Sequence, residues 1–124
     1  MKVIQTQKAP AAVGPYSQAI EVNGLIFTSG QLPIIPESGE FINDYIKKAT
    51  ARSLENITEI LQEAGSSLDK VVKVNIFLKD MNDFSSVNEV YSKYFTTNKP
   101  ARSCVEVSKL PKDGIIEIEA VAEK

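Results

Sequence analysis

The chain of 124 residues is long enough to bury the core of a single domain, residues 1–124, and too short to suggest two domains. Its 43% hydrophobic and 24% charged residues exclude wholesale disorder, and no apolar run approaches the ~20 residues that a membrane helix needs. A net charge of −2 argues against nucleic-acid binding, and the N-terminus lacks a signal-peptide pattern, so we expect a cytoplasmic protein that contacts neither nucleic acid nor membrane.

The chain contains no histidine, and Cys104 is its single cysteine. A lone cysteine excludes an intramolecular disulfide framework and a multi-cysteine zinc site. The absence of histidine removes the Ser-His and Cys-His nucleophile pairs, the commonest transition-metal ligand and the usual general base near neutral pH. Any chemistry must therefore rest on carboxylates, arginine, tyrosine, asparagine, backbone groups and water.

The N-terminal third begins with an extended arm. Residues 1–17 hold two prolines, a glycine and several alanines, which favour extended and turn conformations. Residues 18–22 and 25–29 then flank Asn23 and Gly24, and both of these turn residues accept positive φ. The pattern predicts a β-hairpin.

A loop and a long helix follow the hairpin. Prolines and a glycine predict a loop over residues 31–43. Asn43 or Asp44 can cap a helix that Gly65 is well placed to end. Its apolar positions recur at helical spacing: Ile46, Ala49, Leu54, Ile57, Ile60, Leu61 and Ala64.

Residues 71–79 alternate and predict a central strand. Its apolar face is formed by Val72, Val74, Ile76 and Leu78. Asp80 or Asn82 can cap a second helix. The apolar stripe of that helix contains Phe84, Val87, Tyr91, Tyr94 and Phe95. Asn88 lies in the same row, where an amide is either a buried packing group or a group directed at a ligand.

Two further strands end the chain. Pro100 disfavours a helical residue before it and cannot donate to a ladder, so it marks the start of a strand over residues 100–107. Alternation places Arg102, Cys104 and Glu106 on one face of this strand. After a loop over residues 108–114, a last strand carries an apolar row and a mixed row: Ile116, Ile118, Ala120 and Ala122, and Ile115, Glu117, Glu119 and Val121.

The order strand, strand, helix, strand, helix, strand, strand predicts an α+β fold in which two helices pack on one face of a mixed sheet. The other face then carries apolar and polar side chains together: Val71, Phe77, Cys104, Ile115 and Val121, beside Lys73, Asn75, Arg102, Glu117 and Glu119. Such a face is too apolar to be left bare and too polar for a core. We therefore expect an oligomer that packs this face against its copies and encloses a pocket.

The segment from Pro100 to Glu119 resembles the signature of the Rid (YjgF-type) family of reactive intermediate deaminases. It contains Pro-Ala-Arg-Ser-Cys-Val-Glu-Val, then Leu-Pro-Lys-Asp, then Ile-Glu-Ile-Glu, which Ala120 follows. Residues 9–17, followed by Thr28-Ser29-Gly30-Gln31, form a second matching block, so the resemblance covers essentially the whole chain. It implies a chorismate-mutase-like fold and a homotrimer whose pockets are shared between neighbouring subunits.

The resemblance also implies catalytic residues. Without it, Arg102 at the start of a strand is more simply a solvated or rim-paired group, and Glu117 and Glu119 are simply solvated acids. In the family the arginine matching Arg102 holds the substrate carboxylate, which a guanidinium can bind with two parallel hydrogen bonds. Glu117 matches the acidic pocket residue, and Glu119 is expected to be structural.

Other residues are expected to line the same pocket. Cys104 invites a nucleophile role, but with no histidine to activate it we interpret it as a neutral, partly buried thiol in the pocket wall. Tyr16 and Asn88 could be packing groups, and by resemblance both line the site together with the backbone of Ser29 and Gly30. Gly30 has no side chain, which permits a ligand to approach the main chain closely.

These residues predict hydrolysis of short 2-imino acids and their enamines, such as 2-iminopropanoate and 2-iminobutanoate, to 2-keto acids and ammonia, as the resemblance implies. Holding the carboxylate, placing a water and stabilising charge requires no metal and no cofactor. The connection over residues 96–99 lacks an aromatic that some relatives carry, which leaves the preferred substrate size open. The alternative is a non-catalytic small-carboxylate-binding or regulatory module, and action on RNA ranks last because the pI is near 5.2.

Overall fold

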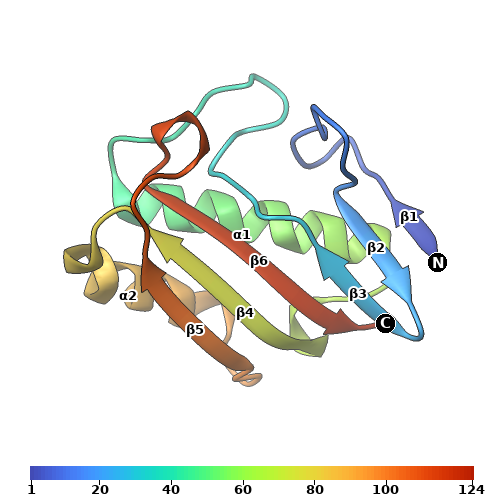
Figure 1. The fold of residues 1–124 in the computed structure, drawn as a ribbon. Helices are drawn as coiled ribbons and strands as arrows, with labels where there is room; N and C mark the ends of the chain where they lie inside the picture. Colours follow the sequence, from blue (N-terminus) through green and yellow to red (C-terminus); the bar gives the residue numbers. More distant parts are fainter.

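The computed structural model describes residues 1–124 and contains a six-stranded mixed sheet with two helices on one face (Figure 1). The strands run in the spatial order β1-β2-β3-β6-β4-β5, and all neighbours are antiparallel except the parallel pair β4 and β5. The α+β fold with a mixed sheet is therefore confirmed. The elements are β1 (Lys2–Ile4), β2 (Ala19–Val22), β3 (Leu25–Thr28), α1 (Ile46–Glu63), β4 (Val71–Leu78), α2 (Phe84–Tyr94), β5 (Ala101–Glu106) and β6 (Ile116–Glu123).

The N-terminal arm contains a strand that the sequence did not predict. β1 pairs antiparallel with β2 and buries Ile4, but three residues are too few to show alternation. The remainder of the arm is fixed by the buried amide of Gln18. This amide accepts from the N–H of Thr6 at 2.7 Å and donates to the carbonyl oxygens of Thr6 at 3.0 Å and Pro10 at 2.8 Å.

The predicted hairpin is confirmed. β2 and β3 pair with Val22 opposite Leu25, and Asn23 and Gly24 take φ values of 51° and 77° between them. Two consecutive residues with positive φ match the right-handed twist of the two strands. This local turn chemistry explains why the hairpin could be predicted.

Helix α1 begins at Ile46, and neither predicted N-cap residue caps it. Tyr45 occupies the N-cap position without a side-chain bond to the helix. Asn43 instead donates to the carbonyl oxygen of Asp113 at 3.0 Å and accepts from the N–H of Ile115 at 2.9 Å. Gly65 follows the helix with a φ of 81°, as predicted for a glycine that ends one.

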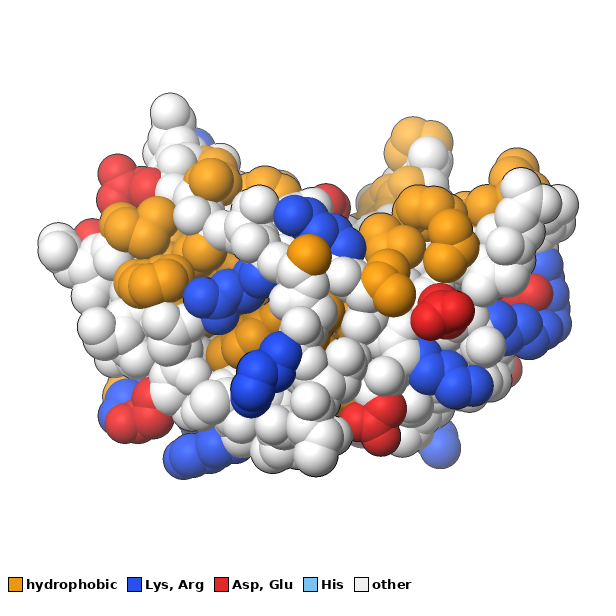
Figure 2. All heavy atoms as spheres, turned by 90° about the horizontal axis from the view of Figure 1, so that it is seen from below, with side chains coloured by type: hydrophobic (Ala, Val, Ile, Leu, Met, Phe, Trp, Pro, Cys, Tyr) orange, Lys and Arg blue, Asp and Glu red, His pale blue; other side chains and the backbone are white.

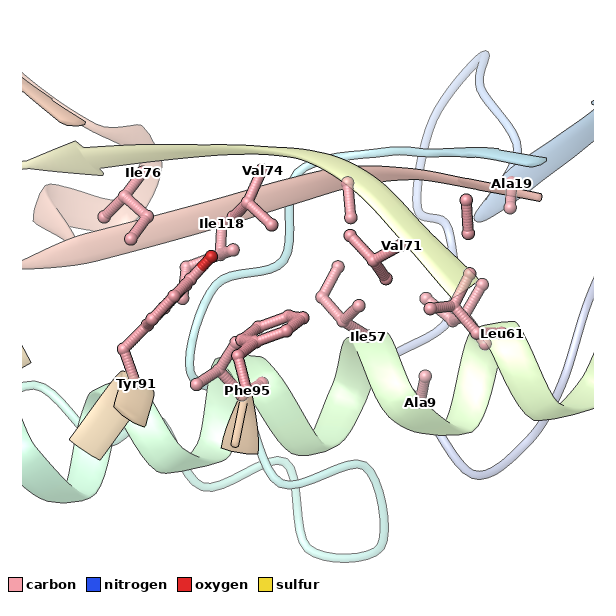
Figure 3. Packing of buried hydrophobic residues seen from close by; sticks show 14 of the residues in the cluster. Ala9, Ala19, Ile57, Leu61, Val71, Val74, Ile76, Tyr91, Phe95 and Ile118 are labelled. Carbon is pink, nitrogen blue, oxygen red and sulfur yellow. The ribbon is translucent and has the colours of Figure 1, made fainter. Parts of the chain in front are cut away.

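Helix α2 is preceded by a 3₁₀ turn, Met81–Asp83, which Asp80 caps by accepting from the N–H of Asn82 at 2.9 Å. Asp80 therefore caps the turn that leads into the helix, and Asn82 caps nothing. The predicted apolar stripe of α2 faces the sheet. Figure 3 shows Tyr91 and Phe95 rising from α2 toward the strands, where both are more than nine-tenths buried.

The core lies between the sheet and the helices (Figure 3). Val72 was predicted to join it, but this residue is 42% exposed while Val71 is buried. The reason is a register shift in the β4–β6 pairing between Val71 and Lys73, which changes the alternation at the start of β4. Ile115 also departs from the prediction, because it lies before β6 and packs against the core.

Arg102 and Cys104 lie on the helix side of the sheet, which corrects their predicted placement beside Glu117. In the parallel pair of β4 and β5, Arg102 stands opposite Val74 and Cys104 opposite Ile76. Neighbouring residues in register point to the same side of a sheet, and Val74 and Ile76 are core residues. Alternation within β5 could not decide which of its two faces turned toward the helices.

The open face of the sheet exposes apolar side chains. Phe27, Val72 and Val105 are each more than 40% exposed. In Figure 2 this face forms the upper margin, and hydrophobic side chains gather in the upper half of the view with lysine and arginine among them. Neither helix combines the length and apolar character needed to cross a membrane.

Candidate functional site

Six of the seven predicted site residues fall into two groups around separate cavities, and Cys104 lies outside both. The Glu117 cavity, of about 430 Å³, is lined by Pro10, Ala11, Val13, Tyr16, Gln18, Ser29, Gly30, Gln31, Leu32, Ile34, Pro111, Lys112 and Glu117. The Arg102 cavity, of about 510 Å³, is lined by Asn88, Tyr91, Ser92, Phe95, Lys99, Pro100 and Arg102. One chain therefore brings Tyr16, Ser29, Gly30 and Glu117 together, and separately Asn88 and Arg102.

Glu117 projects from β6 against the backbone of Gly30. A Cβ added at Gly30 would lie 2.7 Å from Cδ of Glu117 and 2.8 Å from its Oε2, so the missing side chain at position 30 makes room for the carboxylate. Burial, assisted by the nearby Glu119 carboxylate, raises the pKa of Glu117 above its usual range. A carboxyl group with a raised pKa is suited to exchanging protons near neutral pH.

Glu119 has a different environment on the same strand face. Its Oε2 accepts a hydrogen bond from Nδ2 of Asn75 at 3.0 Å, and it does not line the Glu117 cavity. The two acids of β6 are therefore distinct in structure, although their positions in the sequence pattern are alike.

Ser29 joins the end of β3 to the arm that carries Tyr16. Its N–H donates to the carbonyl oxygen of Gln18 at 2.8 Å, and its hydroxyl donates to that of Ser17 at 2.6 Å. Because the hydroxyl proton is used within the chain, this side chain anchors the arm. Tyr16 remains 52% exposed and lines the cavity, so its ring can contact a ligand there.

Arg102 is enclosed by α2. Its Nη1 donates to Oδ1 of Asn88 at 2.7 Å, and its guanidinium carbon lies 4.8 Å from the centroid of the Tyr91 ring and 5.5 Å from that of Phe84. Arginine has no acceptor, so Asn88 must present its oxygen to it and turn its NH₂ group away. The remaining Arg102 donors, together with the Asn88 amide, suit an anionic ligand.

Cys104 is partly buried on the helix side of β5 and lines neither cavity of the chain. Burial raises the pKa of its thiol, and the smaller opposing effect of Arg102 does not cancel this. A thiol with a raised pKa stays neutral at pH 7 and is a poor nucleophile.

Residues that support the site were missed by the sequence-based reasoning. Gln18 fixes the arm, and its position at the start of a strand is ordinary for a polar residue. Asn56 on α1 is fully buried and donates to the carbonyl oxygens of Leu32 at 3.2 Å and Ile34 at 3.0 Å, which holds the loop that lines the Glu117 cavity. A polar residue on the core side of a predicted helix was the available signal.

Comparison with known proteins places this geometry in a family. The family model described as Endoribonuclease L-PSP matches residues 6–124. A RutC family protein of Pyrococcus abyssi is 59% identical over 123 residues, which cover 99% of this chain and 97% of that protein. Reactive intermediate deaminase A of Arabidopsis thaliana chloroplasts is 49% identical over 121 residues, which cover 98% of this chain and 65% of that protein.

Solved structures agree with these relatives. Escherichia coli TdcF with bound serine has a TM-score of 0.96 and 43% identity, with 100% of this chain and 99% of that chain covered. The yjgF gene product of E. coli has a TM-score of 0.96 and 44% identity, with the same coverage. The fold is thus the chorismate-mutase-like fold of these proteins, and the chain belongs to the Rid family, which includes the RutC, YjgF and L-PSP proteins.

Proposed function

We propose that the protein hydrolyses short 2-imino acids and their enamines, with 2-iminopropanoate and 2-iminobutanoate as substrates, to 2-keto acids and ammonia in the cytoplasm. The observation that carries this proposal is that the chain offers two complementary groups, each lining a cavity that can hold a small acid. One is Arg102, which has no acidic partner, and the other is Glu117, whose carboxyl group has a raised pKa. The relative named reactive intermediate deaminase and the relative with bound serine, a small amino acid, support it.

Arg102 binds the substrate carboxylate in this mechanism and orients the imine carbon. Glu117 accepts a proton from water as the water oxygen bonds to the carbon of the protonated imine and the C=N π electrons move to nitrogen, which gives a neutral carbinolamine. Glu117 then delivers this proton to the amine nitrogen. The C–N bond breaks and ammonia leaves as the keto C=O bond forms, and the hydroxyl proton passes to Glu117, which releases it to the departing ammonia. One carboxyl group serves first as base and then as acid, as a raised pKa allows.

The complete site is proposed to form between subunits of a homotrimer. Arg102 lies on the helix side of the sheet and Glu117 projects from the opposite face, so one chain cannot bring both to one small molecule. The Arg102 cavity of one subunit would face the Glu117 cavity of its neighbour. The exposed apolar side chains of the open face support such an assembly.

The test is an assay in which an amino-acid oxidase or threonine dehydratase generates the imine in the presence of this protein. We expect keto-acid formation to be faster than in buffer, and faster than with the Glu117→Gln variant at equal concentration. The same rate in all three samples would overturn the proposed reaction.

The alternative function is a small-carboxylate-binding or regulatory module. The serine bound to TdcF and the donor-rich Arg102 cavity favour it as a second candidate. Calorimetry with 2-ketobutanoate distinguishes the two: binding without any acceleration of imine hydrolysis supports the module, whereas binding with acceleration supports the enzyme.

A further inference from the structure

The arginine of the Arg102 cavity is enclosed by three uncharged residues of one helix. Tyr91 and Phe84 offer their rings, at 4.8 and 5.5 Å from the guanidinium carbon, and Asn88 accepts one hydrogen bond at 2.7 Å. These residues follow the spacing i, i+4, i+7, so they form a single stripe along α2. We call Phe84, Asn88 and Tyr91 the arginine stripe.

No carboxylate neutralises Arg102, which belongs to none of the three ion pairs in the chain. An acidic partner would occupy the guanidinium donors and compete with an incoming carboxylate. An aromatic ring instead attracts the cation through its face and leaves the N–H donors at the edge of the guanidinium group available. The arginine stripe therefore holds the guanidinium in place and leaves its positive charge free to attract a carboxylate.

Tyr91 contacts Arg102 through its ring and not through its hydroxyl. The hydroxyl is buried and has no hydrogen-bond partner, and Figure 3 shows it directed toward the sheet near Ile118. The ring stacks on Phe95 with centroids 4.6 Å apart, and Tyr91 is only 8% exposed. Packing on Phe95 keeps the ring from turning away from Arg102.

We propose that Tyr91 and Phe84 are positioning residues, which fix the Arg102 guanidinium so that its free donors meet the substrate carboxylate. The inference rests on the proposed function of Arg102 and adds a determinant of substrate affinity that touches no reacting atom. Because the rings act through Arg102, they affect carboxylate binding and leave the proton-transfer step at Glu117 largely unchanged.

Four variants on α2, one of them a control, test this proposal in the intact protein. We expect Tyr91→Leu and Phe84→Leu each to raise the KM for the imino acid and the Kd for 2-ketobutanoate roughly tenfold, with kcat changed less than about threefold. Tyr91→Phe keeps the ring, so its KM and Kd should match the wild type. Tyr94→Leu is the matched control, because Tyr94 lies on α2 but bonds Glu55 instead of contacting Arg102.

An NMR measurement checks the geometry independently of turnover. Ring currents should shift the Arg102 side-chain protons upfield in the wild type and in Tyr91→Phe, and this shift should be reduced in Phe84→Leu, where the substituted residue is only partly buried. Unchanged KM and Kd in Phe84→Leu and in a folded Tyr91→Leu would overturn the proposal while leaving hydrolysis intact. If no imine is hydrolysed, the proposed function fails, and the Kd and NMR values still decide whether the stripe positions Arg102.

Discussion

Glu117 and Glu119 are the same residue type on the same strand, and their surroundings give them different chemical properties. Both lie on one face of β6, yet Glu119 does not line the Glu117 cavity and instead accepts a hydrogen bond from Asn75. Burial raises the pKa of Glu117, so its carboxylate form is lost at a higher pH than that of an ordinary glutamate. A substitution at Glu117 therefore tests the proposed proton transfer, and the same substitution at Glu119 is its control.

We expect Glu117→Gln to lower kcat by on the order of 10² to 10⁴, because the amide fills the same space but cannot accept a proton. Glu119→Gln should change kcat little. In the wild type, kcat/KM should fall on the acid side at a pH above the ordinary glutamate pKa. Steady-state kinetics across pH 4 to 9 measure all three effects, and equal losses in the two variants would mean that another group positions the water.

Glu117 should also reduce stability at neutral pH. A raised pKa means that the folded chain binds this proton more tightly than the unfolded chain does, so stability falls as pH rises through this range. Glu117→Gln should therefore resist urea better than the wild type at pH 7. The difference should vanish at a pH below the ordinary glutamate pKa of about 4, where both side chains are neutral. A Glu117→Gln variant less stable than the wild type at pH 7 would contradict this.

Gly30 is expected to matter for activity more than for folding. Its φ is not positive, so alanine is compatible with the backbone, but the new Cβ would displace the Glu117 carboxyl group. We expect Gly30→Ala to lower kcat at least tenfold, since small displacements of a catalytic group are costly, with an almost unchanged Tm. Combining Gly30→Ala with Glu117→Asp, which shortens the acid, should recover part of the loss, whereas Glu117→Asp alone should not exceed the wild type.

At the scale of elements, α1 fixes the loop of the Glu117 cavity from outside the site. Asn56 is fully buried, donates to the carbonyl oxygens of Leu32 and Ile34, and accepts two hydrogen bonds from Arg52, at 3.1 and 2.8 Å. Arginine only donates, so it orients the Asn56 amide toward the loop. A helix that contributes no residue to the cavity therefore shapes one of its walls.

We expect Asn56→Ala to cost roughly 1–3 kcal/mol of unfolding free energy, because two loop carbonyls and Arg52 lose their partner. Urea denaturation measures this cost, and the KM of the folded variant should rise as the loop loosens. Thr58→Ala on the same helix removes only a local hydrogen bond to Leu54 and should have the smaller effect. Equal destabilisation by the two variants would show that Asn56 does not hold the loop.

At the scale of the whole molecule, the separation of the two cavities is the reason why we expect an oligomer. Arg102 and Glu117 lie on opposite sides of one sheet, and Phe27, Val72 and Val105 leave apolar surface exposed on the open face. Light scattering should report a trimer at micromolar concentration. The molecular mass tests only the assembly, whereas mixing two inactive variants tests whether subunits share a site.

Mixed trimers should regain activity that neither parent has. We expect Arg102→Lys and Glu117→Gln proteins to be nearly inactive by themselves. After unfolding and refolding together in equal amounts, about a quarter of the sites should combine an intact Arg102 with an intact Glu117 from different subunits. No recovery, in mixtures whose subunits are shown to exchange, would place the whole site within one chain.

The sequence by itself determined every α-helix and strand except β1, and with the family resemblance it pointed to six residues that line the two cavities. Local chemistry settles the Asn23-Gly24 hairpin and the Gly65 helix end, because each depends on the φ values that a few adjacent residues accept. The resemblance to the Rid family depends on short blocks of residues that are contiguous in the chain. Period-two alternation likewise separates the core row of β6 from the row that carries Glu117.

Only the tertiary structure decided which face each strand presents and which loops are held. Alternation defines two faces of β5 but does not say which one meets α2, so Arg102 was placed on the wrong side. The bulge at Val72, the β1 pairing and the loop-binding amide of Asn56 depend on partners more than a dozen residues away. Such contacts follow from packing between distant segments, and no local pattern in the sequence specifies them.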